Sequence, residues 1–221
     1  MEVIPVINCP DVQSASDRLR VAKQFAQWVH LDVSDARFTF NRSWGDPQMW
    51  KTLNPGVKLE AHLMVEEPEK VVRDWLEAGA KRIIVHFEAL ADPAFRFTQV
   101  DPKHVAEDIM AACEEFGAEL MLALSPETKV EKARPYLHAF TQFQILAVYA
   151  GPSGQRFLSF VTDKIALLRN EVPHARIEVD GGIDPETTRR VKEAGADVVA
   201  SGTYIFGSSD PKKAYEELTA I

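Results

Sequence analysis

Four polar side chains stand in segments that otherwise have the apolar character of buried strands. They are His30 and Asp32 in HLDV, His62 in EAHLMV and Asp180 in IEVDGG. Because alternate residues of a strand share one face, His30 and Asp32 can point the same way. One buried His or Asp is more often hydrogen-bonded structure, but four together favour a metal site. This mixed nitrogen and oxygen donor set suits one divalent ion, whether Zn, Mn, Fe(II) or Co.

Glycine-rich turns form a second group of candidates. Glycine lets backbone N–H groups approach an anion closely, so these turns are candidate phosphate sites. Tight strand-to-helix turns also favour glycine, and that reading stays open. The candidate residues are Gly151, Pro152, Ser153, Gly154, Gly181, Gly182, Gly202 and Thr203.

The elements that must position these residues alternate between short apolar runs and longer segments of helical period. The predicted strands are 3–7, 28–33, 57–64, 82–87, 119–124, 142–148, 176–179 and 197–200. The predicted helices are 12–25 with Asp11 as its cap, 47–53, 67–77, 102–116, a segment ending near 138, another ending at 170, 185–193 and 211–218. The stretch 88–101 is expected to be irregular.

Eight strand–helix units, with one strand roughly every 28 residues, predict an α/β chain folded as a single (β/α)8 barrel. Nothing divides the chain, so residues 1–221 are expected to form one domain. An open doubly wound sheet is the alternative, but it lacks a recognisable switch point. In a barrel, the residues at the carboxyl ends of the strands meet at one mouth, and loops seven and eight usually hold phosphate.

Composition narrows the classes of partner. The net charge is −8 and the pI is about 5.3, which argues against nucleic acid but allows an anionic substrate. Cys9 and Cys113 are too few for a disulfide scaffold. With no apolar stretch long enough for a bilayer and no signal-like start, we expect a cytoplasmic protein without a membrane partner.

The remaining histidines divide into two groups. His86 could point into the barrel, where a core histidine and a functional one are equally plausible. The others are expected on the surface: His104, His138 and His174.

Several segments, taken in order, resemble the ribulose-phosphate 3-epimerase family over nearly the whole chain. They are HLDVSDARF, AHLMVEEPEKVV, GAKRIIVHFEA, GPSGQRF and IEVDGGIDPETTRRVKEAGADVVASGTYIF. The resemblance implies a metal-dependent barrel enzyme that interconverts ribulose 5-phosphate and xylulose 5-phosphate, and it suggests a homo-oligomer.

Carried over by position, His30, Asp32, His62 and Asp180 match the family's metal ligands. Asp32 and Asp180 also match its two acid–base carboxylates. Met64 matches a methionine that lines the site. The residues matching the phosphate-binding segments are Gly151, Pro152, Ser153, Gly154, Gly181, Gly182, Gly202 and Thr203.

The chain also departs from the family pattern. A serine that contacts substrate is replaced by Val6, a lining methionine by Ser34, a glycine by Ala36 and a histidine by Arg37. The loop after the sixth strand is less glycine-rich, and residues 92–101 resemble an insertion. The resemblance therefore implies an intact metal centre with an altered substrate shell.

With these departures, three hypotheses of function remain. The first is C3 epimerisation of a ketose phosphate by two aspartates. The second is a related reaction, such as epimerisation of allulose 6-phosphate. The third is a metal- and phosphate-binding protein without turnover.

Overall fold

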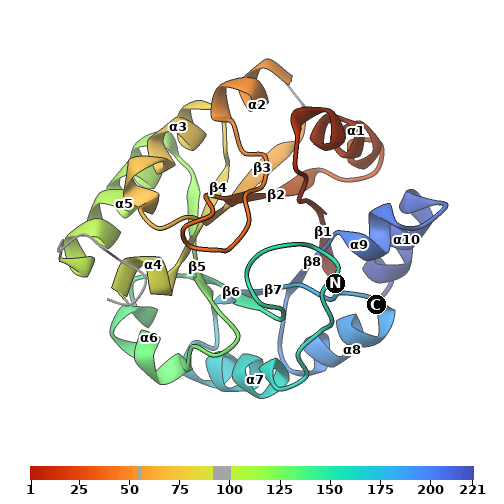
Figure 1. Cartoon of the computed structure of the whole chain (residues 1–221). Coiled ribbons are helices and arrows are strands. Elements are labelled where there is room, and N and C mark those ends of the chain that lie inside the picture. The colour runs from red at the N-terminus through yellow and green to blue at the C-terminus, as the bar shows by residue number, and fades with distance from the viewer. Residues whose placement is uncertain (54–55, 92–100) are drawn as a thin grey trace.

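The computed structural model describes residues 1–53, 56–91 and 101–221, and its strands close into a parallel barrel in chain order (Figure 1). The strands are β1 Glu2–Ile7, β2 Trp28–Ser34, β3 Lys58–Met64, β4 Arg82–His86, β5 Glu119–Leu124, β6 Gln142–Leu146, β7 Arg176–Asp180 and β8 Val198–Ser201. Strand β1 pairs with both β2 and β8, which completes the ring. The predicted (β/α)8 barrel is confirmed.

Helices surround the barrel in Figure 1. They are α1 Val12–Ala22, α2 Pro47–Leu53, α3 Val72–Glu77, α4 Phe87–Ala91, α5 Pro102–Phe116, α6 Val130–Leu137, α7 Val161–Glu171, α8 Pro185–Glu193, α9 Thr203–Phe206 and α10 Pro211–Thr219, with a 3-10 turn η1 Pro68–Lys70. Among the described residues, no helix combines the length and apolar character needed to cross a membrane.

Local sequence signals account for the helix ends. The Asp11 side chain accepts a hydrogen bond from the Ser14 N–H and so begins α1. Asp184 and Thr187 form a reciprocal capping box at the start of α8. Gly117 ends α5 in the left-handed conformation, which glycine adopts without steric cost.

Two sequence expectations were wrong. The helix expected over 67–77 is η1 followed by α3, because the backbone leaves helical geometry at Val71, whose φ is −120°. The stretch expected to be irregular from residue 88 begins with α4, which buries Phe87, Glu88, Ala89 and Leu90. Of the suggested insertion 92–101, residues 92–100 lie outside the described residues, and Asp101 caps α5.

The barrel interior has an apolar part and a polar part. The apolar part contains Ile84, Met121, Ala123 and Leu146, all buried. Inward side chains recur at every second residue of a strand. The polar part consists of inward residues that lie closer to the amino ends of the strands. Its members, also buried, are His30, Glu60, Arg82, Gln144 and Glu178.

Candidate active site

The four predicted metal ligands lie together at the mouth of the barrel. His62 Nδ1 is 2.8 Å from Asp32 Oδ1, and His30 Nε2 is 3.2 Å from both of these atoms. Asp180 Oδ2 approaches His62 Nδ1 at 3.7 Å and His30 Nε2 at 3.9 Å. One donor atom from each residue lies within 4.8 Å of every other, and all four residues are buried. Strands β2, β3 and β7 supply them, as the alternation of inward residues predicted.

Burial and hydrogen bonding give the four groups different protonation preferences. Although burial opposes it, hydrogen bonds to Asp32 and Glu60 raise the pKa of His30 well above its usual value. Burial lowers the pKa of His62 to about 4. Burial would raise the pKa of Asp32, but hydrogen bonds with His30 and His62 lower it below its usual range. Burial and the charge of Asp32 raise the pKa of Asp180 to about 7. The cluster thus favours an added positive charge. It also shifts the pKa values of its two carboxylates in opposite directions.

The donor set fits a divalent cation. The two imidazoles turn different ring nitrogens toward the cluster, Nε2 from His30 and Nδ1 from His62. The other nitrogen of His30 lies 2.8 Å from Glu60 Oε1, as expected for a ligating histidine whose second nitrogen donates to a carboxylate. A second group, His30 with Glu60 and Glu178, is close enough to hold an ion. However, the buried Arg82 guanidinium already compensates Glu60 from 2.5 Å, so we assign that group to hydrogen bonding.

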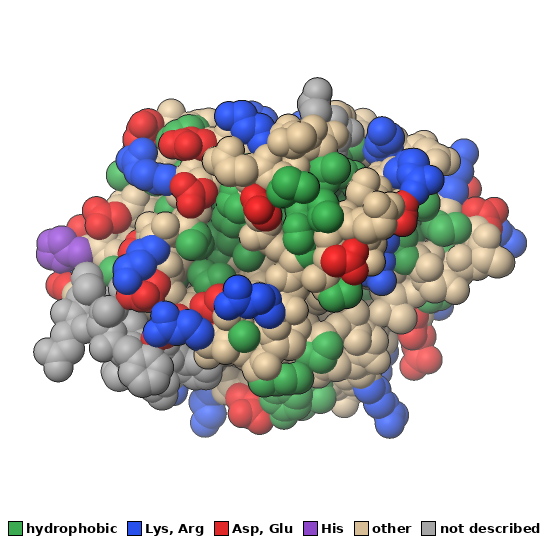
Figure 2. Space-filling view, turned by 45° about the horizontal axis from the view of Figure 1, so that its top comes forward, with side chains coloured by type: hydrophobic (Ala, Val, Ile, Leu, Met, Phe, Trp, Pro, Cys, Tyr) green, Lys and Arg blue, Asp and Glu red, His purple; other side chains and the backbone are tan. Residues whose placement is uncertain are grey.

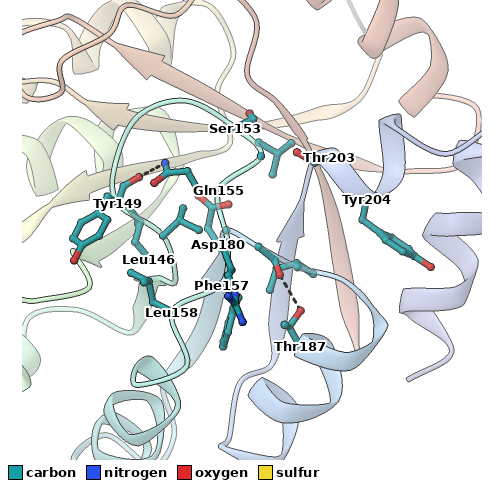
Figure 3. A pocket seen from close by; sticks show the side chains of 18 of the residues that line it. Leu146, Tyr149, Ser153, Gln155, Phe157, Leu158, Asp180, Thr187, Thr203 and Tyr204 are labelled. Atoms are coloured by element: carbon teal, nitrogen blue, oxygen red, sulfur yellow. Dashed lines mark hydrogen bonds between the residues drawn. The ribbon is translucent and has the colours of Figure 1, made fainter.

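A cavity of about 950 Å³ is lined by residues that include both aspartates, and Figure 3 shows Asp180 among the side chains of its lining. Asp32 and Asp180 face this space. The loop between β6 and α7 and the turns after β7 and β8 contribute further to its wall. All of the predicted substrate-shell residues line it, namely Met64, Gly151, Pro152, Ser153, Gly154, Gly181, Gly182, Gly202 and Thr203.

Two of these glycines are required by the backbone. Gly181 and Gly182 have φ values of +105° and +65°, a region that side chains disfavour. A Cβ on Gly181 would lie 2.4 Å from Val148 Cγ2, and one on Gly182 would lie 2.6 Å from the Phe157 nitrogen. Close packing of the β6–α7 loop on this turn therefore excludes a side chain at either position.

Sequence reasoning missed Asn8. Its side-chain amide donates to Asp32 Oδ2 at 2.8 Å and to the Gly151 carbonyl at 3.1 Å. It thus connects one aspartate to the loop that borders the cavity. Asn8 is the first residue after β1, whereas Asp180 is the last residue of β7.

The sequence profile of the ribulose-phosphate 3-epimerase family matches residues 2–206. The chain belongs to this family. Among curated relatives, the ribulose-phosphate 3-epimerase of Candida glabrata is 32% identical, with 87% of this chain and 80% of the relative covered. That of Mycobacterium bovis is 30% identical, with 98% and 90% covered.

Solved structures with little sequence identity to this chain share its architecture. The 3-hexulose-6-phosphate synthase of Salmonella typhimurium matches with a TM-score of 0.68 at 16% identity, covering 100% of this chain and 97% of that one. At that identity the likeness shows the barrel fold alone.

The departures from the family pattern fall in two places. Val6 lines the cavity, and so does the less glycine-rich loop after β6. Ser34 is buried on β2, and Arg37 lies 2.5 Å from Glu66 Oε2 on the neighbouring loop. Ala36 keeps a φ of +62°, the one left-handed non-glycine residue in the described part of the chain. The replacement of glycine there leaves the backbone in a conformation that alanine adopts only with strain.

The surface carries mixed charge. On the face shown in Figure 2, Lys and Arg side chains are interspersed with Asp and Glu side chains. His104, His138 and His174 are exposed, as expected, whereas His86 is fully buried beside His62.

Proposed function

We propose that this protein is a metal-dependent ribulose-phosphate 3-epimerase that inverts C3 of ribulose 5-phosphate to give xylulose 5-phosphate. One observation carries the proposal. Asp32 and Asp180, from β2 and β7, border one cavity and also converge with His30 and His62 in a single donor cluster. Family membership supports the same reaction.

Epimerisation next to a carbonyl requires removal of the C3 proton from one face and delivery of a proton to the other. Asp32 directs Oδ1 at the histidines and has Oδ2 held by Asn8, so Oδ2 is the oxygen we assign to proton transfer. Asp180, the other carboxylate that borders the cavity, is the group we assign to the opposite role of acid. A bound divalent ion would supply Lewis-acid stabilisation of the charge that develops on the substrate oxygens.

Other groups that line the cavity would position the sugar. Backbone amides of the turns at Gly182 and Gly202 are our candidates for the phosphate. Arg190 borders the same cavity, and its Cζ lies 5.5 Å from the centroid of the Phe157 ring. A phosphate held there would supply binding energy that aligns C3 with the two carboxylates.

The decisive experiment is solvent deuterium incorporation at C3 by the metal-loaded protein, measured by NMR with ribulose 5-phosphate and allulose 6-phosphate in parallel. We expect exchange and conversion with the pentulose phosphate. Faster conversion of the hexulose phosphate would replace the substrate assignment. Tight binding of both sugars with no exchange would indicate a binding protein without turnover.

The variant Asp180→Asn tests the division of labour. If Asp32 is the other base, the variant should still exchange the C3 proton of one epimer while net conversion is lost. Metal content is measured alongside, because Asp180 is also a candidate ligand. Full conversion with normal metal content would contradict the two-aspartate assignment.

A further inference from the structure

A third histidine, His86, and a third carboxylate, Glu88, extend the donor cluster. His86 Nε2 lies 2.8 Å from His62 Nε2, and the two rings stack with centroids 5.0 Å apart. His86 Nδ1 lies 3.1 Å from Glu88 Oε2. His62, His86 and Glu88 are at most 2% exposed. A continuous buried hydrogen-bond chain therefore starts at the ring nitrogen that His62 turns away from the cluster.

The protons of this chain have one consistent arrangement. A histidine that ligates through Nδ1 carries its proton on Nε2. The His62 Nε2–H then donates to His86 Nε2, so His86 must carry its own proton on Nδ1. That N–H donates to Glu88 Oε2. A carboxylate can only accept, so Glu88 fixes the direction of both hydrogen bonds.

Glu88 is itself held from the opposite side. Its Oε1 accepts hydrogen bonds from the Ser125 N–H at 3.0 Å and from the Thr128 hydroxyl, both in the segment between β5 and α6. Phe38 packs against the His86 ring, with centroids 4.6 Å apart. The carboxylate and the imidazole therefore have little freedom to turn.

We propose that His86 and Glu88 are positioning residues of the metal centre, which hold His62 in the tautomer that presents Nδ1 to the ion. The inference rests on the metal site of the proposed function. Glu60 has the corresponding role for His30, which it contacts directly. Glu88 acts on His62 through the intervening imidazole of His86. Loss of such outer partners typically weakens metal binding by about 10–100-fold.

Metal affinity tests this role without any sugar. Zn²⁺ binding to the metal-depleted protein is measured by competition with a chromophoric chelator. We expect His86→Phe to raise the dissociation constant by about 10–100-fold, and His86→Gln, whose amide oxygen can still accept from His62, to raise it less. The matched control is Phe38→Leu, which loosens packing on the His86 ring but leaves the hydrogen bonds from His62 to Glu88 in place. We expect it to change the dissociation constant by less than about twofold.

A dissociation constant unchanged in folded His86→Phe would overturn the proposal, as would an equal loss in Phe38→Leu. Should His86→Phe fail to fold, the comparison uses His86→Gln and NMR of the wild-type protein. In ¹⁵N spectra of the zinc-loaded wild type, we expect His62 to be protonated on Nε2 and His86 on Nδ1. The opposite tautomer of His62 would also overturn the proposal.

The two proposals fail separately. Weakened zinc binding in His86→Phe, with no epimerisation by the wild type, would leave the positioning role standing and refute the sugar reaction. Unchanged zinc binding in His86→Phe, with normal epimerisation by the wild type, would refute the positioning role and leave the sugar reaction standing.

Discussion

Replacing Arg82 with methionine tests how the barrel tolerates charge beneath the active site. Arg82 is 3% exposed, and its Nη1 lies 2.5 Å from Glu60 Oε2 and 3.8 Å from Glu178 Oε2. Burial and the nearby Glu60 raise the pKa of Glu178 to about 8, so Glu178 is protonated at pH 7. Arg82→Met therefore removes one of the two cationic groups that contact Glu60 among the described residues, and leaves that carboxylate with His30 alone.

The size of the loss follows from what Glu60 can do next. Removing one partner of a buried ion pair costs about 3–5 kcal/mol. Glu60 can limit that cost by taking up a proton, which at pH 7 costs about 3.4 kcal/mol, or about 1.36 kcal/mol for each of the 2.5 units above its ordinary pKa of 4.5. At pH 5 the same proton costs only about 0.7 kcal/mol. Arg82→Met should thus lose about 3 kcal/mol at pH 7 and markedly less at pH 5.

The assay is urea unfolding followed by circular dichroism at both pH values. In the variant, Glu60 has a raised folded-state pKa, so stability is retained at low pH and falls as the pH rises through that value. The double variant Arg82→Met with Glu60→Gln removes the buried charge and should recover most of the loss at pH 7. A loss below 1 kcal/mol, or the same loss at both pH values, would refute this reasoning.

Four further outcomes are expected. Ala36→Gly should raise the free energy of unfolding by roughly 0.5–1 kcal/mol, since relief of left-handed strain exceeds the added freedom of the unfolded chain; a decrease in urea unfolding would contradict it. Gly182→Ala should lose at least about 2 kcal/mol more than Gly117→Ala, which has a similar φ but open space around its Cβ; equal losses would show that the loop yields. Burial opposes the shift, but hydrogen bonds from His86 and Thr128 lower the pKa of Glu88 to about 2. The advantage of wild type over Glu88→Gln, up to about 3 kcal/mol above pH 4.5, should therefore decline toward pH 2, and a pH-independent difference would argue against it. Chelation should lower the melting temperature and Zn²⁺ should restore it; no shift on chelation would count against the metal site.

Strand alternation made the donor cluster predictable. Once a barrel was expected, Asp32, His62 and Asp180 had to meet, because each stands at an inward position near the carboxyl end of its strand, and His30 lies one inward position before Asp32. The same rule, applied two residues earlier, would have identified Glu60 and Glu178 as a buried polar layer. Their side chains were overlooked because a lone carboxylate in an apolar run carries no signal of its partner.

Other features depend on tertiary contacts that residue types do not reveal. Asn8 was missed because its two acceptors, Asp32 and Gly151, come from distant parts of the chain. Ala36 gives no hint of a left-handed backbone, since alanine disfavours it. His86 could not be assigned from sequence, because its neighbour His62 and its acceptor Glu88 lie on different elements.

The order of the strands has a consequence for folding. Candidate ligands come from β2, β3 and β7, and β7 becomes a neighbour of β2 only through β8 and β1. No fragment containing only the first or second half of the chain can assemble all four. A metal bound here would stabilise the closed ring by mass action while leaving half-barrels unaffected. It would thereby widen the free-energy gap between the native barrel and partly folded forms, and unfolding would become more cooperative.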